Sequence, residues 1–166
     1  INGLSDSCHP CQLLADVQTM QERFGDVRNL RVTWIGDGNN VCHSYLEAAN
    51  IFEFNLTVAV PSSYKPAPEW VEKANGRVTF VESPEEAVKG AQVVTTDVWT
   101  SMGQENEIKD RLRAFNGYQI TPALLDFAAK DVCFLHCLPA HKGEEISENL
   151  FADSRTNSVW AQAGNR

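Results

Sequence analysis

The sequence lacks a long apolar run, a basic cluster and a recognisable leader. No apolar stretch approaches the roughly 20 residues that a membrane-spanning helix needs. The 14 lysine and arginine residues are outnumbered by 22 acidic residues and form no cluster. This argues against nucleic-acid binding, which requires a basic patch. Residues 1–4 are neither a basic nor an apolar signal segment, and no initiator methionine is present, so we expect a piece of a longer chain.

The sequence also lacks an even number of cysteines. It has five, and disulfide-stapled domains are usually smaller than this chain, so we expect reduced thiols and a cytoplasmic location. Cys8 and Cys11 mimic the C-x-P-C of a redox site, but the polar residues 3–7 before them do not resemble the strand that such a site requires. We also considered a zinc site and predict none, because structural-zinc spacing is missing from Cys8, His9, Cys11, Cys137 and His141.

The composition is that of one globular domain spanning residues 1–166, with 43% apolar and 22% charged residues. Short β-branched and apolar runs, typical of buried strands, alternate with stretches typical of helices. This alternation predicts an α/β fold with a three-layer, doubly wound (Rossmann-like) parallel sheet and helices on both faces. The expected strands are 30–35, 56–60, 78–81, 92–96, 132–135 and an edge strand at 158–160.

Capping residues indicate where several helices begin. We expect residues 5–7 to cap a helix that ends before Gly25, Ser83 to cap a second helix, and Thr121 to cap a third that reaches Ala129. Other helices are expected at 41–52, 69–74, within 105–114, and starting at 163–166.

In a doubly wound fold, ligands bind beyond the carboxyl ends of the strands, so the residues after each strand are the candidates for a site. Residues 36–40 follow the first strand and resemble the start of a G-x-G-x-x-G dinucleotide loop. Val41 stands where the third glycine belongs, and no ribose-binding acid follows the second strand at Val60. A tight turn with an asparagine helix cap is the competing interpretation.

Polar and reactive side chains follow the fourth and fifth strands as well. Singly, each has an ordinary interpretation: Asp97 as a helix cap, His136 as a hydrogen-bonded core histidine, Cys137 as a small buried hydrophobe. Together they are expected at one edge of the sheet. A carboxylate can meet an ammonium, and amides can meet a carboxylate, so the group suits an amino acid. Its members are Asn39, Asn40, Asp97, Ser101, His136 and Cys137.

Four motifs in this order and spacing resemble the second, amino-acid-binding domain of the ornithine carbamoyltransferase family, along the whole chain. The Ser-Met-Gly and His-Cys-Leu-Pro elements are the most specific to the ornithine branch. The motifs are His9-Pro10-Cys11-Gln12, Gly36-Asp37-Gly38-Asn39-Asn40, Asp97-x-Trp99-x-Ser101-Met102-Gly103-Gln104-Glu105 and His136-Cys137-Leu138-Pro139.

The resemblance implies carbamoyl transfer from carbamoyl phosphate to the side-chain amine of L-ornithine, giving L-citrulline and phosphate without a metal or organic cofactor. It implies that Asn40 binds the ornithine carboxylate, and that Asp97 binds the α-ammonium with help from Ser101 and Met102. The residues implied at carbamoyl phosphate are His9, Gln12, Cys137, Leu138 and Arg166. We expect three of these groups to be catalytic: His9 at the oxyanion, and Cys137 with Asp97 as a proton relay.

The phosphate-gripping Ser-Thr-Arg-Thr-Arg element of the family's first domain is absent from the sequence, and the family's final helix would begin near Arg166. We therefore expect an ornithine-binding half that does not turn over alone and whose complete enzyme is a trimer or a multiple of trimers. Three alternatives stay open: a carbamoyltransferase for another amine such as putrescine or acetylornithine, a non-catalytic amino-acid-binding module, and a nucleotide-dependent dehydrogenase.

Overall fold

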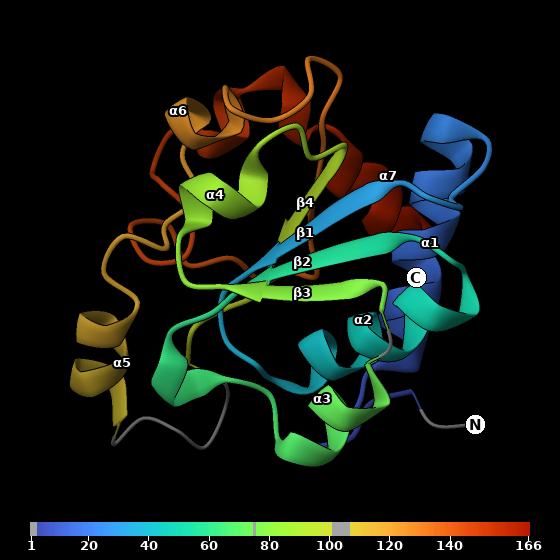
Figure 1. Cartoon of the computed structure of the whole chain (residues 1–166). Helices are drawn as coiled ribbons and strands as arrows, with labels where there is room; N and C mark the ends of the chain where they lie inside the picture. Colours follow the sequence, from blue (N-terminus) through green and yellow to red (C-terminus); the bar gives the residue numbers. More distant parts are fainter. Residues whose placement is uncertain (1–2, 75, 101–106) are drawn as a thin grey trace.

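A computed structural model describes residues 3–74, 76–100 and 107–166. Five strands form one parallel sheet in the order β3-β2-β1-β4-β5. The order reverses between β1 and β4, as expected for a doubly wound fold (Figure 1). The predicted fold class is therefore confirmed. The strands are β1 Arg31–Ile35, β2 Asn55–Ala59, β3 Val78–Val81, β4 Val93–Thr96 and β5 Cys133–His136.

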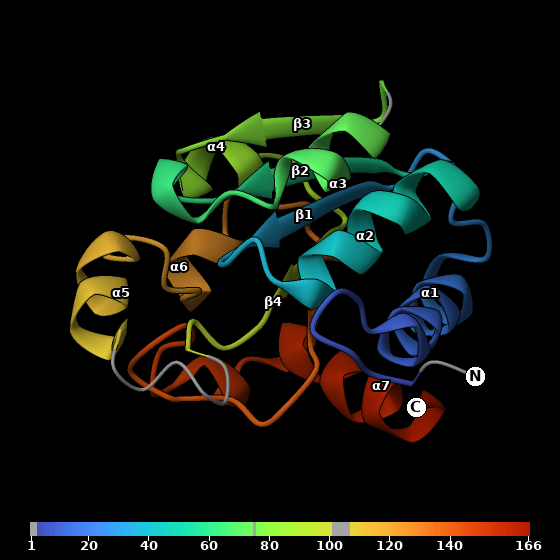
Figure 2. The ribbon, with the colours of Figure 1, turned by 90° about the horizontal axis from the view of Figure 1, so that it is seen from below.

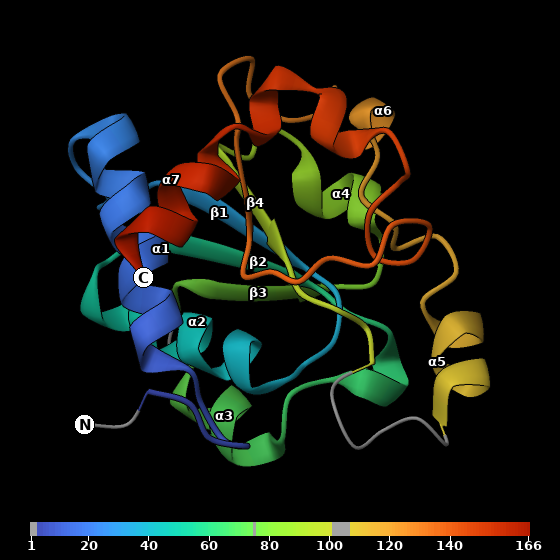
Figure 3. The same cartoon turned by 180° about the vertical axis from the view of Figure 1, so that it is seen from behind.

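Helices cover both faces of the sheet (Figures 1 and 2). The first three lie on one face, α4 and α6 lie on the other, and α5 stands beyond the carboxyl ends of the strands. The last helix, α7, packs against α1 and β5 (Figure 3). The bounds are α1 Pro10–Phe24, α2 Asn40–Ile51, α3 Pro68–Lys73, α4 Pro84–Val88, α5 Ile108–Ala114, α6 Pro122–Leu125 and α7 Ser158–Asn165.

Alternation along the strands divides the interior into two cores. Trp34 of β1 and Leu135 of β5 belong to the core beneath α1 and α2, whereas the adjacent Ile35 and Phe134 belong to the core beneath α4 and α6. Successive side chains of a strand point to opposite faces, so strands covered on both sides are apolar throughout. No helix in the described part of the chain has the length and apolar character needed to cross a membrane.

Three predicted helix caps are confirmed. Asn39, Ser83 and Thr121 each accept backbone N–H groups from the first turn of α2, α4 and α6. The cap expected from residues 5–7 is wrong, because the Ser5 hydroxyl accepts from Cys8 N within a separate turn and His9 occupies the cap position. The helix expected to reach 129 ends at Leu125, where i to i+3 hydrogen bonds replace the helical pattern.

The edge strand expected at 158–160 is wrong. These residues begin α7, whose buried positions Val159 and Gln162 are three apart, while Trp160 is exposed. A three-residue apolar run cannot distinguish a strand from a helix by period alone. The helix start expected at 163–166 is also wrong, because the helix begins at Ser158 and 163–165 form its last turn.

Gly38 is required by its surroundings. An added Cβ would lie 2.3 Å from Pro66 N and 2.6 Å from both Tyr64 O and Lys65 C. Because all three atoms are backbone, Gly38→Ala is expected to lower the free energy of unfolding by about 3 kcal/mol, measured by urea denaturation. The control Gly164→Ala meets no atom within 4 Å and should change stability by less than about 1 kcal/mol. Equal effects would contradict this packing.

Candidate functional site

The site lies at the carboxyl end of the sheet, where β1 and β4 are neighbours and strand order reverses. The segment after β1 leads to Asn39, the cap of α2, and Asp97 directly follows β4. The segment after β5 begins with Cys137. Three segments distant in sequence therefore deliver polar side chains to one place, as predicted.

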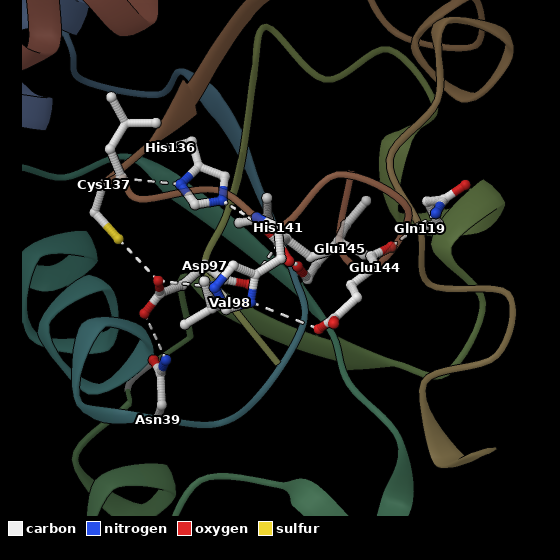
Figure 4. A network of polar contacts seen from close by, with 12 residues as sticks. Asn39, Asp97, Val98, Gln119, His136, Cys137, His141, Glu144 and Glu145 are labelled. Carbon is white, nitrogen blue, oxygen red and sulfur yellow. Dashed lines mark hydrogen bonds and ion pairs between the residues drawn. The ribbon is translucent and has the colours of Figure 1, made fainter. Parts of the chain in front are cut away.

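The Asp97 carboxylate lies between an amide and a thiol (Figure 4). Asn39 directs its Oδ1 to the backbone N–H groups of Val41 and Cys42, so its Nδ2 points outward and donates to Asp97 Oδ2 at 2.7 Å. The Cys137 thiol donates to Asp97 Oδ1 at 2.9 Å. Both donors are neutral, so the carboxylate keeps its capacity to attract an ammonium group.

Cys137 is a thiol and not a thiolate in this arrangement. Burial raises its pKa well above the ordinary value, and the adjacent Asp97 carboxylate raises it further. The relay expected from Cys137 and Asp97 therefore has a defined direction: the thiol is the hydrogen-bond donor, and the carboxylate is the acceptor.

His136 lies behind this cluster and not in it. It is the last residue of β5, and its Nε2 contacts Glu145 Oε1 at 3.0 Å, with both side chains fully buried. Leu138 N donates to His136 Nδ1, so Nδ1 is an acceptor and Nε2 carries the proton toward Glu145. This contact supports Leu138 at a left-handed φ of 49°. The interpretation of His136 as a hydrogen-bonded core histidine is confirmed. It stands at the carboxyl edge of the sheet as expected, but its side chain contacts Glu145 and not Asp97.

Of the remaining residues predicted to bind ornithine, Asn40 is described by the structure and does not point to Asp97. Asn40 directs its Nδ2 to Ser5 O at 2.7 Å, and its Oδ1 accepts from Val41 N, so its amide faces the segment before α1. Ser101 and Met102 lie outside the described residues.

Two of the residues predicted at carbamoyl phosphate, Gln12 and Arg166, are linked to Cys137. Arg166 Nη1 donates to Gln12 Oε1 at 2.9 Å and to the Cys137 carbonyl at 3.0 Å. His9 donates its backbone N–H to Ser44 Oγ, and within the described ranges its buried Nδ1 has no hydrogen-bond partner. The His9 side chain at the start of α1 therefore keeps a nitrogen that can bind a ligand.

Two buried groups near the site were missed by the sequence analysis. Asp37 pairs with Arg111 at 2.7 Å, and Arg111 also donates to Trp99 O, which joins α5 to the segments after β1 and β4. Asp16 of α1 accepts from three side chains beneath Gln12. Most of these contacts follow no local sequence pattern, because Asp37 and Arg111 are 74 residues apart and Gln162 is 146 residues from Asp16. Only the Gln12–Asp16 contact has the local i, i+4 spacing of a helix.

The structure does not bring together the cysteines and histidines considered for zinc. Across the described residues, the one group of three or more potential ligands close enough for a metal is His141, Glu144 and Glu145. One carboxylate oxygen of Glu145 already contacts His136 and the backbone N–H of His141. Among the described residues, the cysteines and histidines weighed as zinc ligands are therefore not assembled into one group.

The pKa of Asp16 makes stability depend on pH. Burial raises this pKa from 3.8 to about 6, against hydrogen bonds from Tyr45, Gln162 and Gln12. The folded state holds the proton to a higher pH than the unfolded state, so the Asp16 contribution is full below pH 4 and is lost as pH rises through about 6. A pKa difference of about 2 corresponds to about 3 kcal/mol.

Asp16→Asn removes this titration. Urea unfolding at pH 4 and pH 7.5 is therefore expected to show a variant that gains up to about 3 kcal/mol relative to the wild type as pH rises. A stability difference between the two proteins that stays constant with pH would contradict the assignment.

Comparison with known proteins decides the family. Residues 28–166 match the family described as aspartate/ornithine carbamoyltransferase, Asp/Orn binding domain. The chain belongs to the aspartate/ornithine carbamoyltransferase family. This assignment and the contact of Gly38 with protein backbone replace the dinucleotide-loop interpretation, and the competing interpretation of a tight turn with an asparagine cap is confirmed.

Among its carbamoyltransferase relatives, the chain is 58% identical over its full length to ornithine carbamoyltransferase 1, anabolic, of Pseudomonas savastanoi pv. phaseolicola, and 57% identical to the anabolic enzyme of Pseudomonas aeruginosa. The structure of ornithine carbamoyltransferase from Pyrococcus furiosus matches 99% of this chain and 55% of its own, with 41% identity and a TM-score of 0.92. The chain spans about half, 54%, of the length of these two Pseudomonas relatives.

Proposed function

We propose that this chain is the ornithine-binding half of an ornithine carbamoyltransferase, which transfers the carbamoyl group of carbamoyl phosphate to the side-chain amine of L-ornithine. The products are L-citrulline and phosphate. One observation carries the proposal: the Asp97 carboxylate, held by the Asn39 amide and the Cys137 thiol, lies beside the Gln12–Arg166 pair. An amino-acid subsite and a carbamoyl phosphate subsite thus meet at Cys137.

Ornithine binds by its α-amino acid end in this proposal. Its α-ammonium pairs with Asp97. Its carboxylate accepts a hydrogen bond from the Asn40 amide, whose Nδ2 must first release Ser5 O. Ser101 and Met102, which lie outside the described residues, assist at the α-ammonium as the family resemblance implies. The side-chain amine then extends toward Cys137 and Leu138.

The reaction requires a neutral amine, although amines of this type titrate near 10.4. The proton that the side-chain ammonium loses passes to the Cys137 sulfur as the thiol proton passes to the Asp97 carboxylate, so the amine becomes neutral and its attack on the carbamoyl carbon expels phosphate. His9 donates to the oxyanion that forms at the carbamoyl carbon, while Gln12, Leu138 and Arg166 hold carbamoyl phosphate. Positioning two small substrates side by side supplies at best about 7–11 kcal/mol of the barrier reduction.

The proposed parent enzyme is the longer chain that contains this half and a carbamoyl phosphate domain. Its assembly is a trimer or a multiple of trimers, and its location is the cytoplasm. The chain by itself lacks the phosphate-binding Ser-Thr-Arg-Thr-Arg element. It is therefore expected to form no citrulline from carbamoyl phosphate and ornithine in a colorimetric assay, whereas the parent enzyme does. A clear citrulline signal from this chain alone would contradict the proposal that turnover requires the carbamoyl phosphate domain as well.

The experiment that tests the function is a substrate panel on the parent enzyme. Carbamoyl phosphate is supplied with ornithine, acetylornithine, putrescine or aspartate, and released phosphate is measured. Turnover with ornithine and little with the others is expected, because putrescine has no carboxylate for Asn40 and acetylornithine has no α-ammonium for Asp97. Preference for another amine would move the substrate assignment. A folded parent enzyme that turns over none of them would be a binding module.

A further inference from the structure

A buried carboxylate organises the floor of the carbamoyl phosphate subsite. Asp16 is 1% exposed and lies one helical turn after Gln12 on α1. Its Oδ1 accepts from Gln12 Nε2 at 2.8 Å and from Gln162 Nε2 at 2.5 Å, and its Oδ2 accepts from the Tyr45 hydroxyl at 2.6 Å. Three elements, α1, α2 and α7, thus converge on one carboxylate.

These contacts fix which end of the Gln12 amide faces the site. An amide has a donating nitrogen and an accepting oxygen, and turning it by half a rotation exchanges them. A carboxylate accepts only, so Gln12 must present Nε2 to Asp16. Its Oε1 then faces Arg166, the residue that also contacts the Cys137 carbonyl. Gln12 therefore presents a hydrogen-bond acceptor, its Oε1, to the site.

We propose that Asp16 is a positioning residue that holds the Gln12 carbonyl oxygen toward the acyl-phosphate subsite and so selects an acyl group bearing N–H donors. This inference rests on the proposed function, because it assumes that the acyl phosphate binds beside Gln12. The selected group is the –NH2 of a carbamoyl phosphate. An acetyl phosphate has the same shape but carries a methyl group, which cannot donate to Gln12 Oε1.

Asp16 is itself held in place. Gln162 donates to Asp16 with its Nε2 and accepts His136 N with its Oε1 at 2.9 Å, so its own amide orientation is fixed at both ends. Tyr45 occupies the other carboxylate oxygen. With every contact made, rotation of the Asp16 carboxylate would break hydrogen bonds to buried groups.

The contact pattern provides a conservative variant. Both glutamines donate to Oδ1, so Asp16→Asn keeps that acceptor and turns its new Nδ2 toward Tyr45, whose hydroxyl can accept. Asp16→Ala removes the acceptor and frees the Gln12 amide to turn. The two variants therefore separate the orientation of Gln12 from the charge of Asp16.

The test compares two ligands in the parent enzyme and its two Asp16 variants: KM for carbamoyl phosphate and the inhibition constant of acetyl phosphate. Asp16→Ala is expected to raise KM for carbamoyl phosphate about 10-fold and to change acetyl phosphate inhibition less than about 3-fold. Asp16→Asn is expected to restore most of the carbamoyl phosphate affinity. Equal losses for both ligands, or an Asn variant as poor as the Ala variant, would overturn the proposal.

A second measurement does not depend on whether Asp16→Ala folds. In the isotope-labelled wild-type chain, a through-hydrogen-bond coupling between Gln12 Nε2 and the Asp16 carboxyl carbon is expected, and its absence would overturn the assigned orientation. Failure of the proposed function is distinguishable, because a wild-type parent enzyme would then show no turnover of carbamoyl phosphate with ornithine.

Discussion

Asp97→Asn in the parent enzyme is expected to lower kcat/KM for ornithine about 1,000-fold while leaving KM for carbamoyl phosphate within a few-fold of the wild type. The substitution keeps the shape and one acceptor oxygen, which can still accept from Cys137, but it places an amide donor opposite Asn39 Nδ2 and removes the charge that pairs with the α-ammonium. Losing one partner of a desolvated charge pair costs several kcal/mol. Initial rates at varied ornithine and carbamoyl phosphate concentrations measure both constants.

Asp131→Asn is the matched control, because Asp131 is exposed and precedes β5 at the opposite edge of the sheet. It should leave both kinetic constants unchanged. An Asp97→Asn enzyme that folds and loses less than about 3-fold in kcat/KM for ornithine would show that Asp97 does not bind the α-ammonium.

Arg111→Met is expected to lower the free energy of unfolding of this chain by about 3–5 kcal/mol, because it leaves the Asp37 carboxylate buried without its partner. The two side chains are only 7% and 9% exposed. Burial already raises the pKa of Asp37, and Arg111 opposes that rise. The cost of Arg111→Met should therefore shrink as acid protonates Asp37.

The control lies on the same helix. Arg113 is 81% exposed and stands 3.8 Å from Asp110, so Arg113→Met should change stability by less than about 0.5 kcal/mol. Urea unfolding at pH 5 and pH 7.5 measures both variants. If Arg111→Met costs no more than Arg113→Met, the buried pair does not hold α5 to the segments after β1 and β4.

The fold followed from patterns that are local in sequence. Apolar runs of strand length between capped helices predicted the parallel sheet, and the rule for carboxyl ends predicted that Asn39, Asp97 and Cys137 would meet. At 158–160 the short apolar run wrongly predicted a strand. These residues belong to α7, whose buried face is set by its contact with α1 and β5.

Partners of buried polar groups could not be predicted. In the sequence, Asp16 is an ordinary residue of a helix. Its burial and its contact with Gln162, 146 positions away, appear only in the folded chain. Glu145 similarly has no local signal for its contact with His136. Such pairings depend on how elements pack and not on propensity or period. The sequence therefore predicted the residues that face the ligand but not the buried carboxylates of Asp16 and Glu145 that hydrogen-bond behind them.

A crystal structure of the parent enzyme with carbamoyl phosphate and L-norvaline tests directly where the amino acid lies. Norvaline keeps the α-amino acid end of ornithine and lacks the reacting amine, so the complex cannot turn over. Its α-ammonium nitrogen is expected at about 2.7–3.2 Å from an Asp97 carboxylate oxygen, with the side chain directed toward Cys137. Norvaline bound with its ammonium away from Asp97, or at another part of the sheet, would contradict this placement.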